Sequence, residues 1–246
     1  MFTDITSIVR KEWKEMFLQR GSWKSGLLNQ IVVLAVLGVF LPMQAGARWL
    51  SNPMLTIVWL WLPISLTMNM VTDAIAGERE RHTLDTLLAS RLSDQAILIG
   101  KIAASVLYGF TVSVLALLLA AVTINLGYPN GGFQFYPLPI FAASVVLVLL
   151  ANTLMAALGV LVSLRAQTAR QAYQYLSIGM LVLFLGPLLA FQLVPAPLKE
   201  SLAASLAGWD TAKLMAGVML GLAAVDAGLI AAARARFQRS RLIDLS

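Results

Sequence analysis

The chain has 246 residues, of which 59% are hydrophobic and 12% charged, and its mean hydropathy is +0.80. Because a soluble domain carries about 25% charged residues, this composition excludes an ordinary soluble fold and indicates a membrane protein. Cysteine is absent, which excludes a disulfide framework, a thiolate zinc site and a cysteine nucleophile. The net charge of +6 does not indicate nucleic acid, since the basic residues flank the apolar segments.

Residues 1–24 predict an amphipathic helix. Apolar residues such as Ile5, Ile8 and Trp13 recur at steps of three and four, with charged residues between them. One interpretation is an interfacial helix lying on the membrane surface, and the other is a helix packed on the chain's own cytoplasmic loops. Both keep this segment on the cytoplasmic side.

About six apolar segments follow, and each is long enough to be a transmembrane helix. They span residues 27–43, 53–76, 96–126, 138–164, 172–194 and 211–233. A turn-rich loop at 127–137 and a segment at 195–210 separate some of them on the extracytoplasmic side. We therefore expect an all-α, polytopic membrane protein in which residues 1–246 form a single transmembrane domain.

The distribution of basic residues predicts the orientation. All but three of the 18 lysines and arginines lie at the termini, in the loops after the second and fourth segments or, for Lys101, in the first turns of the third segment, and the exceptions are Arg48, Lys199 and Lys213. Basic residues are retained on the cytoplasmic side of a membrane. We therefore expect a multi-pass protein of the cytoplasmic (inner) membrane with both termini in the cytoplasm.

The loop at 77–95 is the most informative segment. It begins with the charged run Gly77-Glu78-Arg79-Glu80. Thr83 can cap a short helix on which Leu84, Leu87 and Leu88 form one apolar stripe. Such a helix fits a groove on a cytoplasmic partner, or it packs back on the bilayer surface. Periodicity alone does not choose between the two.

This loop resembles the one between helices two and three of the ABC-2 type permeases of ATP-binding cassette exporters. That pattern has Gly-Glu-basic-Glu, Gly-Thr-Leu-Glu, paired leucines, a Ser/Thr-Pro step and a distal Gly-Lys. The matching residues are Gly77, Glu78, Arg79, Glu80, Thr83, Leu84, Leu87, Leu88, Ser90, Gly100 and Lys101. His82, Asp85 and Arg91 stand where glycine, glutamate and proline are usual. Asp85 keeps the charge, whereas the lost glycine and proline predict a longer helix at both ends.

The resemblance implies that this loop is a cytoplasmic coupling helix seated on an ABC ATPase subunit. The implied coupling residues are Gly77, Glu78, Arg79, Glu80, Thr83, Leu84, Asp85, Leu87 and Leu88. It further implies that the chain pairs with a second permease subunit, as a homodimer or a heterodimer, in the lipid bilayer. No nucleic-acid partner is expected. The chain's Gly100-Lys101 is no phosphate loop, because Ile102 follows it and Gln95 stands in place of the first glycine. We therefore expect a non-catalytic subunit that binds no cofactor, with ATP and magnesium held by the partner.

Asp226 is the notable ionisable residue inside the apolar segments. Buried carboxyls in membranes pair with other polar groups, so the sequence predicts a polar site in which Asp226 bonds Asn152 or Asn69. Contact with a substrate or a proton is the alternative interpretation. The lone histidine, His82, has no partners suited to a metal site, so we expect none.

Three other functions compete with an exporter permease. A haem-exporter-like subunit of cytochrome maturation would have a similar layout. A membrane-embedded enzyme would need a nucleophile with a base, paired acids or a metal cluster at one depth, and the apolar segments contain only Asp73 and Asp226 as acids. A structural scaffold would leave the loop motif unexplained.

Overall fold

The structure is a computed structural model that describes residues 2–18, 23–52, 55, 61–83, 87, 89–129, 132–207 and 211–237. Every regular element in this part of the chain is helical, as the long apolar segments predict. The elements are α1 (Phe2–Leu18), α2 (Trp23–Ala35), η1 (Val36–Phe40), α3 (Leu41–Ala45), α4 (Arg48–Ser51), α6 (Trp61–Thr72), η2 (Asp73–Gly77), α7 (Glu78–Glu80), α9 (Asp94–Gly127), α10 (Leu138–Ser163), α11 (Ala169–Leu193), α12 (Ala196–Ala207) and α13 (Thr211–Arg236).

Three helices of the described chain are long and apolar enough to cross a membrane. They are Asp94–Gly127, Leu138–Ser163 and Ala212–Arg236. They correspond to three of the segments that the sequence predicted, and a shorter apolar helix at Gln30–Ala45 overlaps the first predicted segment. The predicted segment at 172–194 lies in α11, and the described part of 53–76 forms α6 and η2. The all-α prediction is therefore confirmed, with three helices that can span a bilayer.

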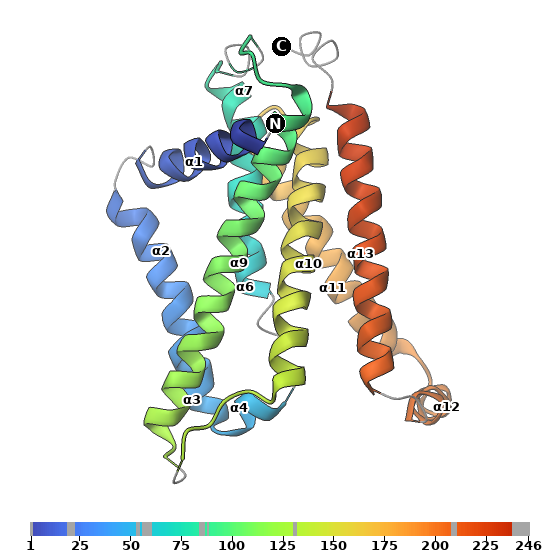
Figure 1. Ribbon diagram of the computed structural model, residues 1–246. Helices are drawn as coiled ribbons and strands as arrows, with labels where there is room; N and C mark the ends of the chain where they lie inside the picture. Colours follow the sequence, from blue (N-terminus) through green and yellow to red (C-terminus); the bar gives the residue numbers. More distant parts are fainter. Residues whose placement is uncertain are drawn as a thin grey trace.

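Helix α9 is the centre of the bundle, because α1, α2, η1, α3, α6 and α10 all pack against it. Helix α10 in turn packs against α6, α11 and α13. Figure 1 shows α1 lying across one end of the bundle, the end at which α7 lies and α13 finishes. We call this the α1 end. Its core joins Ile8 of α1 to Ile97 of α9, Val160 of α10 and Phe237 after α13.

Side-chain caps fix where two of the long helices begin. The hydroxyl of Ser93 accepts a hydrogen bond from the backbone N–H of Ala96 at 3.2 Å, and Thr168 accepts one from Gln171 at 3.1 Å. Each bond satisfies a donor that the first helical turn would otherwise leave free. Both caps lie at the α1 end, so the starts of α9 and α11 are set close to the loop at 77–83.

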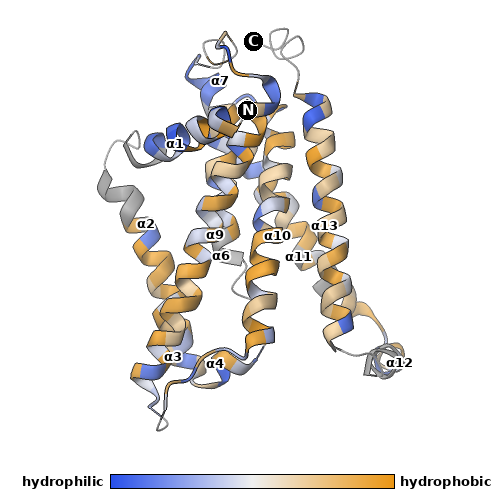
Figure 2. Ribbon diagram, in the orientation of Figure 1, coloured by the Kyte–Doolittle hydropathy of each residue, from blue (hydrophilic) through white to orange (hydrophobic). Residues whose placement is uncertain are grey.

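Hydrophilic residues gather at the α1 end, whereas the middle of the bundle is hydrophobic (Figure 2). The loops that the charge count assigned to one side therefore meet at one end of the structure. Arg48 in α4, Lys199 in α12 and Lys213 at the start of α13 belong to elements at the other end (Figure 1). The two ends thus differ in charge as the sequence predicted.

Candidate functional site

The loop that resembles a coupling element begins with a tight turn. Helix α7 follows η2 directly and ends at Glu80, after which Arg81 and His82 turn the chain. His82 has a φ of 55°, in the left-handed region that glycine adopts freely. The prediction that losing glycine here lengthens the helix is therefore wrong at this end, because His82 itself takes the glycine-like conformation. Leu84, Asp85 and Leu88 lie outside the described residues.

Four charged side chains from three elements meet behind this turn, and we call Lys11, Glu12, Glu78 and Lys101 the ion cluster. The Nζ of Lys101 lies 2.7 Å from Glu12 Oε1 and 3.1 Å from Glu78 Oε1, and it also donates to the carbonyl of Ala74 in η2. Lys11 Nζ lies 3.0 Å from the same Glu78 oxygen. Lys101 is 1% exposed and Glu78 2%, so water does not separate these ions.

The charges of the ion cluster balance, and each depends on the others. Burial raises the pKa of Glu12, an effect that the charge of Lys101 opposes. Partial burial lowers the pKa of Lys11, but its hydrogen bond to Glu78 and the charge of that carboxylate outweigh this and raise it. Removing one partner from a buried ion pair costs roughly 3–5 kcal/mol. The ion cluster therefore holds α1, α7 and α9 together while all its members remain.

Two further contacts, besides the ion cluster, attach α1 to α9 near Gly100 and Lys101. A Cβ on Gly100 would lie 2.7 Å from Cγ2 of Ile8, so glycine is what allows α1 to lie this close. The indole of Trp13 donates to the carbonyl of Ala104 at 3.2 Å. Sequence reasoning missed Glu12, whose partner Lys101 is 89 residues away. The sequence did contain a signal for a buried charge at this position. Glu12 lies four residues after Ile8, so it is a carboxylate on the apolar face of α1.

Arg79 and Glu80 bind the turn between α10 and α11. The guanidinium of Arg79 donates to the carbonyls of Ala166 at 2.6 Å and Leu164 at 3.3 Å, near the end of α10. Glu80 accepts from the backbone N–H of Ala169, in the first turn of α11, at 3.2 Å. A cation thus meets a helix C-terminus and an anion meets a helix N-terminus, which suits both helix dipoles. Burial lowers the pKa of Arg79, whose partners are neutral carbonyls.

Gly77 lets an ion pair form across the end of η2. A Cβ on Gly77 would overlap Oδ1 of Asp73, which is itself 3.1 Å from Nη1 of Arg81. Both charged side chains are more than 40% exposed, so the pair contributes little to stability. A larger residue at position 77 would therefore displace the exposed Asp73 carboxylate from this ion pair.

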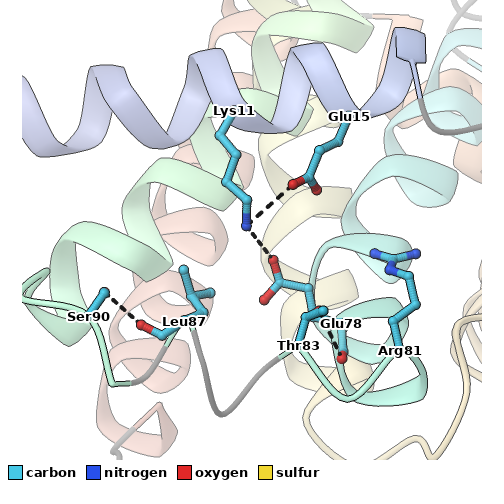
Figure 3. Close-up of a pocket in the computed structure, with 7 residues that line it drawn as sticks. All are labelled: Lys11, Glu15, Glu78, Arg81, Thr83, Leu87 and Ser90. Carbon is cyan, nitrogen blue, oxygen red and sulfur yellow. Dashed lines mark hydrogen bonds and ion pairs between the residues drawn. The ribbon is translucent and has the colours of Figure 1, made fainter.

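An open cavity of about 420 Å³ lies between α1 and the loop (Figure 3). Its lining residues are Lys11, Glu15, Glu78, Arg81, Thr83, Leu87 and Ser90. Leu87 is half-buried against the core cluster of the α1 end, and its carbonyl accepts from the Ser90 hydroxyl at 2.7 Å. Among the described residues, no group of three or more potential ligands could hold a metal ion. Charged and apolar residues of the predicted coupling loop therefore line the same cavity.

The three residues of the predicted intramembrane polar site do not bond one another. Asn152 accepts a hydrogen bond from Thr67 and donates to the carbonyl of Val148 at 2.7 Å, while Asn69 donates to that of Ser65 at 3.0 Å. Neither oxygen of Asp226 has a hydrogen-bond partner in the described part of the chain. The predicted bond from Asp226 to Asn152 or Asn69 is thus not formed, because both amides are engaged elsewhere.

Comparisons with known proteins identify the family. The sequence model of the ABC-2 family transporter protein matches residues 57–215, which include the loop, α9 and α10. The "ABC transporter permease protein NatB" of Bacillus subtilis (strain 168) is 28% identical over 126 residues, covering 50% of this chain. The match covers 32% of NatB, so the aligned half of this chain spans about a third of that relative's length. Since the family match spans more than half of the sequence and includes the loop with the predicted motif, the chain belongs to the ABC-2 family of transporter permeases.

Proposed function

We propose that this chain is the permease subunit of an ABC exporter, which moves a substrate across the cytoplasmic membrane with ATP hydrolysed by a separate nucleotide-binding subunit. Family membership and the printed name of NatB as a permease support this role. In the proposed assembly residues 1–246 form one transmembrane domain of about six spans, paired with a second permease subunit. ATP and magnesium bind the ATPase, and this chain carries no cofactor.

The observation that carries the proposal is the way the loop at 77–83 is attached to the rest of the molecule. Glu78 binds Lys11 of α1 and Lys101 of α9, while Arg79 and Glu80 bind the turn between α10 and α11. A displacement of this loop would therefore be transmitted to α1, α9, α10 and α11 together. Charged, well-packed contacts of this kind suit an element that transmits movement from an ATPase into the bundle.

The proposed docking surface comprises the cavity, which Leu87 lines, and the predicted apolar stripe of the loop. Leu84, Leu87 and Leu88 would enter a groove on the ATPase, with Asp85 and the exposed Glu80 adding charge. Glu78 has an internal role, because its carboxylate is buried in the ion cluster. Leu87 contacts both the cavity and the chain's own core, so changing it would disturb both.

Co-purification with a tagged ABC ATPase from the same genome tests the docking proposal. Replacing the exposed Thr83 or Ala89 with arginine should reduce the recovered ATPase while leaving the monodispersity of the permease unchanged. Arg170, exposed in the first turn of α11, provides a matched control when changed to alanine. Wild-type recovery of the ATPase by both loop variants would contradict docking at this loop.

The proposed orientation places the α1 end in the cytoplasm. Because the chain has no cysteine, single cysteines can be introduced without background labelling. Cysteines at positions 130 and 199 should react with impermeant reagents in intact cells, whereas one at Ala169 should react only after the cells are opened. The reverse pattern would overturn the orientation.

A further inference from the structure

Asp226 occupies the centre of the face through which α13 meets the bundle. Helix α13 packs chiefly on α10, and Asp226 and Ala233 are its two buried residues in the described range Ala212–Arg236. They lie seven residues apart, on one stripe of the helix. Asp226 is 4% exposed and ten residues before Arg236, which is about 15 Å along the helix. A carboxyl thus fills a position where an apolar side chain is expected.

The facing helix offers no charge to this carboxyl. Helix α10 contains no ionisable residue anywhere between Leu138 and Ser163. On α13 itself, Lys213 lies more than three turns away, and Arg234 and Arg236 lie at least two turns away with exposed side chains. An ionised Asp226 would therefore be buried in apolar surroundings without a cation. The free-energy cost of that state is large, because hydrocarbon does not solvate charge.

The facing helix makes no hydrogen bond to this carboxyl either. The polar side chains of α10 are Ser144, Asn152, Thr153 and Ser163. Ser144 donates to the carbonyl of Ile140, Asn152 to that of Val148 and Thr153 to that of Leu149. The Ser163 hydroxyl has no partner, so it does not bond Asp226. Because Asp226 is covered within a single chain, a second copy packed against α13 could not reach it without moving the helix.

A protonated carboxyl has a bond available that the ionised form lacks. Asn69, Asn125 and Asn152 each donate from Nδ2 to the carbonyl four residues earlier in their own helix. Protonated aspartic acid has nearly the same shape as asparagine and carries one donor hydrogen. A protonated Asp226 can make the same bond to the carbonyl of Leu222. An ionised carboxylate has no hydrogen to donate, so it gains nothing from that carbonyl.

We infer that Asp226 is a proton-binding site inside the membrane, and that its carboxyl holds a proton at neutral pH while α13 lies on α10. In the described chain α13 is attached to the bundle chiefly through α10, so the cover over Asp226 depends on this one helix contact. Movement that brings water to Asp226 would release the proton. Proton binding at this position does not depend on the ATPase proposed above.

Infrared spectroscopy of the purified full-length protein in lipid tests the inference. The wild type at neutral pH should show the carbonyl stretch of a protonated carboxylic acid, and this band should be lost in Asp226→Asn. If the difference between the two proteins instead contains carboxylate bands, Asp226 is ionised and the inference is overturned. Transport is not measured, so failure of the permease proposal would leave this result intact.

A chemical probe provides a second readout on the wild-type protein. Dicyclohexylcarbodiimide enters apolar sites and reacts with protonated carboxyls there. We expect a mass-spectrometric adduct at Asp226 and none at Glu78, which is also buried but paired with Lys101. A water-soluble carbodiimide should show the opposite preference, labelling the exposed Glu80 instead of Asp226. Labelling of Asp226 by the water-soluble reagent alone would contradict a covered, protonated carboxyl.

Discussion

At the α1 end, four charged side chains meet from α1, α7 and α9, and each lies within 3.1 Å of an opposite charge. In α13 a single carboxyl is also shielded from solvent within the chain, with no opposite charge on the helix it faces. The first arrangement keeps ions charged and ties distant segments together. The second favours the neutral form and leaves its helix attached by one face. Burial alone therefore does not define the role of a charged residue, because the partners on neighbouring helices decide it.

The largest loss of stability is expected from removing the buried cation of the ion cluster. Lys101→Met leaves Glu12 and Glu78 buried around an apolar side chain, which should destabilise the protein by roughly 3–5 kcal/mol. Thermal unfolding in detergent and limited proteolysis of α1 measure the effect. The exposed Lys14, changed to methionine, is the matched control on α1. An unchanged unfolding temperature in Lys101→Met would mean that the ion cluster does not hold α1.

Arg79→Ala separates the loop from the turn between α10 and α11. The variant loses two hydrogen bonds from a charged donor, each worth about 1.5–3 kcal/mol. Hydrogen exchange at residues 164–170 should accelerate, and transport per ATP hydrolysed should fall while the ATPase remains bound. Arg165→Ala, in the same turn but exposed, should leave both measurements unchanged. Normal exchange in Arg79→Ala would exclude the proposed transmission through this turn.

Gly100→Val tests the close contact between α1 and α9. The added atoms collide with Ile8, and overpacking of this kind costs typically about 1–3 kcal/mol. We expect faster proteolytic cleavage within α1, with the remaining helices intact. Gly217→Val is the control, because a Cβ there meets nothing within 4 Å. Equal cleavage rates in the two variants would show that contact with Ile8 is unimportant.

Asp226→Asn should change little, in contrast to Lys101→Met. If the carboxyl is protonated, asparagine reproduces its shape and its donor, so the unfolding free energy should shift by less than about 1 kcal/mol. Expression, monodispersity and thermal unfolding measure this. A large loss of stability would indicate that Asp226 is ionised and has a partner that asparagine cannot replace.

The smallest expected effect is the pH dependence of α1 attachment. Glu78 raises the pKa of Lys11 above its ordinary value of 10.5. The stabilisation from this pair is therefore fully present below pH 10.5 and is lost as the pH rises through the higher, folded-state pKa. The effect is small, because Lys11 is 43% exposed and screened by water. Lys11→Met should abolish this alkaline transition in the proteolysis of α1, and a persisting transition would assign it to another group.

The sequence by itself determined the class of the protein and the position of its apolar helices. A run of twenty or more apolar residues is stable only as a helix in a bilayer, so α9, α10 and α13 were predicted close to their observed bounds. The loop motif likewise identified the family, because Glu78, Arg79 and Lys101 match residues of the family's loop pattern. These features depend on local composition and residue spacing, which can be read from one amino-acid sequence.

Only the tertiary structure decided which charges meet. Glu12 and Lys101 are 89 residues apart, and no periodicity links them. The glycine-like turn at His82 and the engagement of Asn152 by Thr67 likewise depend on how helices pack rather than on local sequence. The sequence predicted a partner for Asp226 because buried carboxyls usually have one. The structure leaves it unpaired because every donor on α10 but Ser163 is already bound within its own helix, and that outcome depends on which face of α10 meets α13.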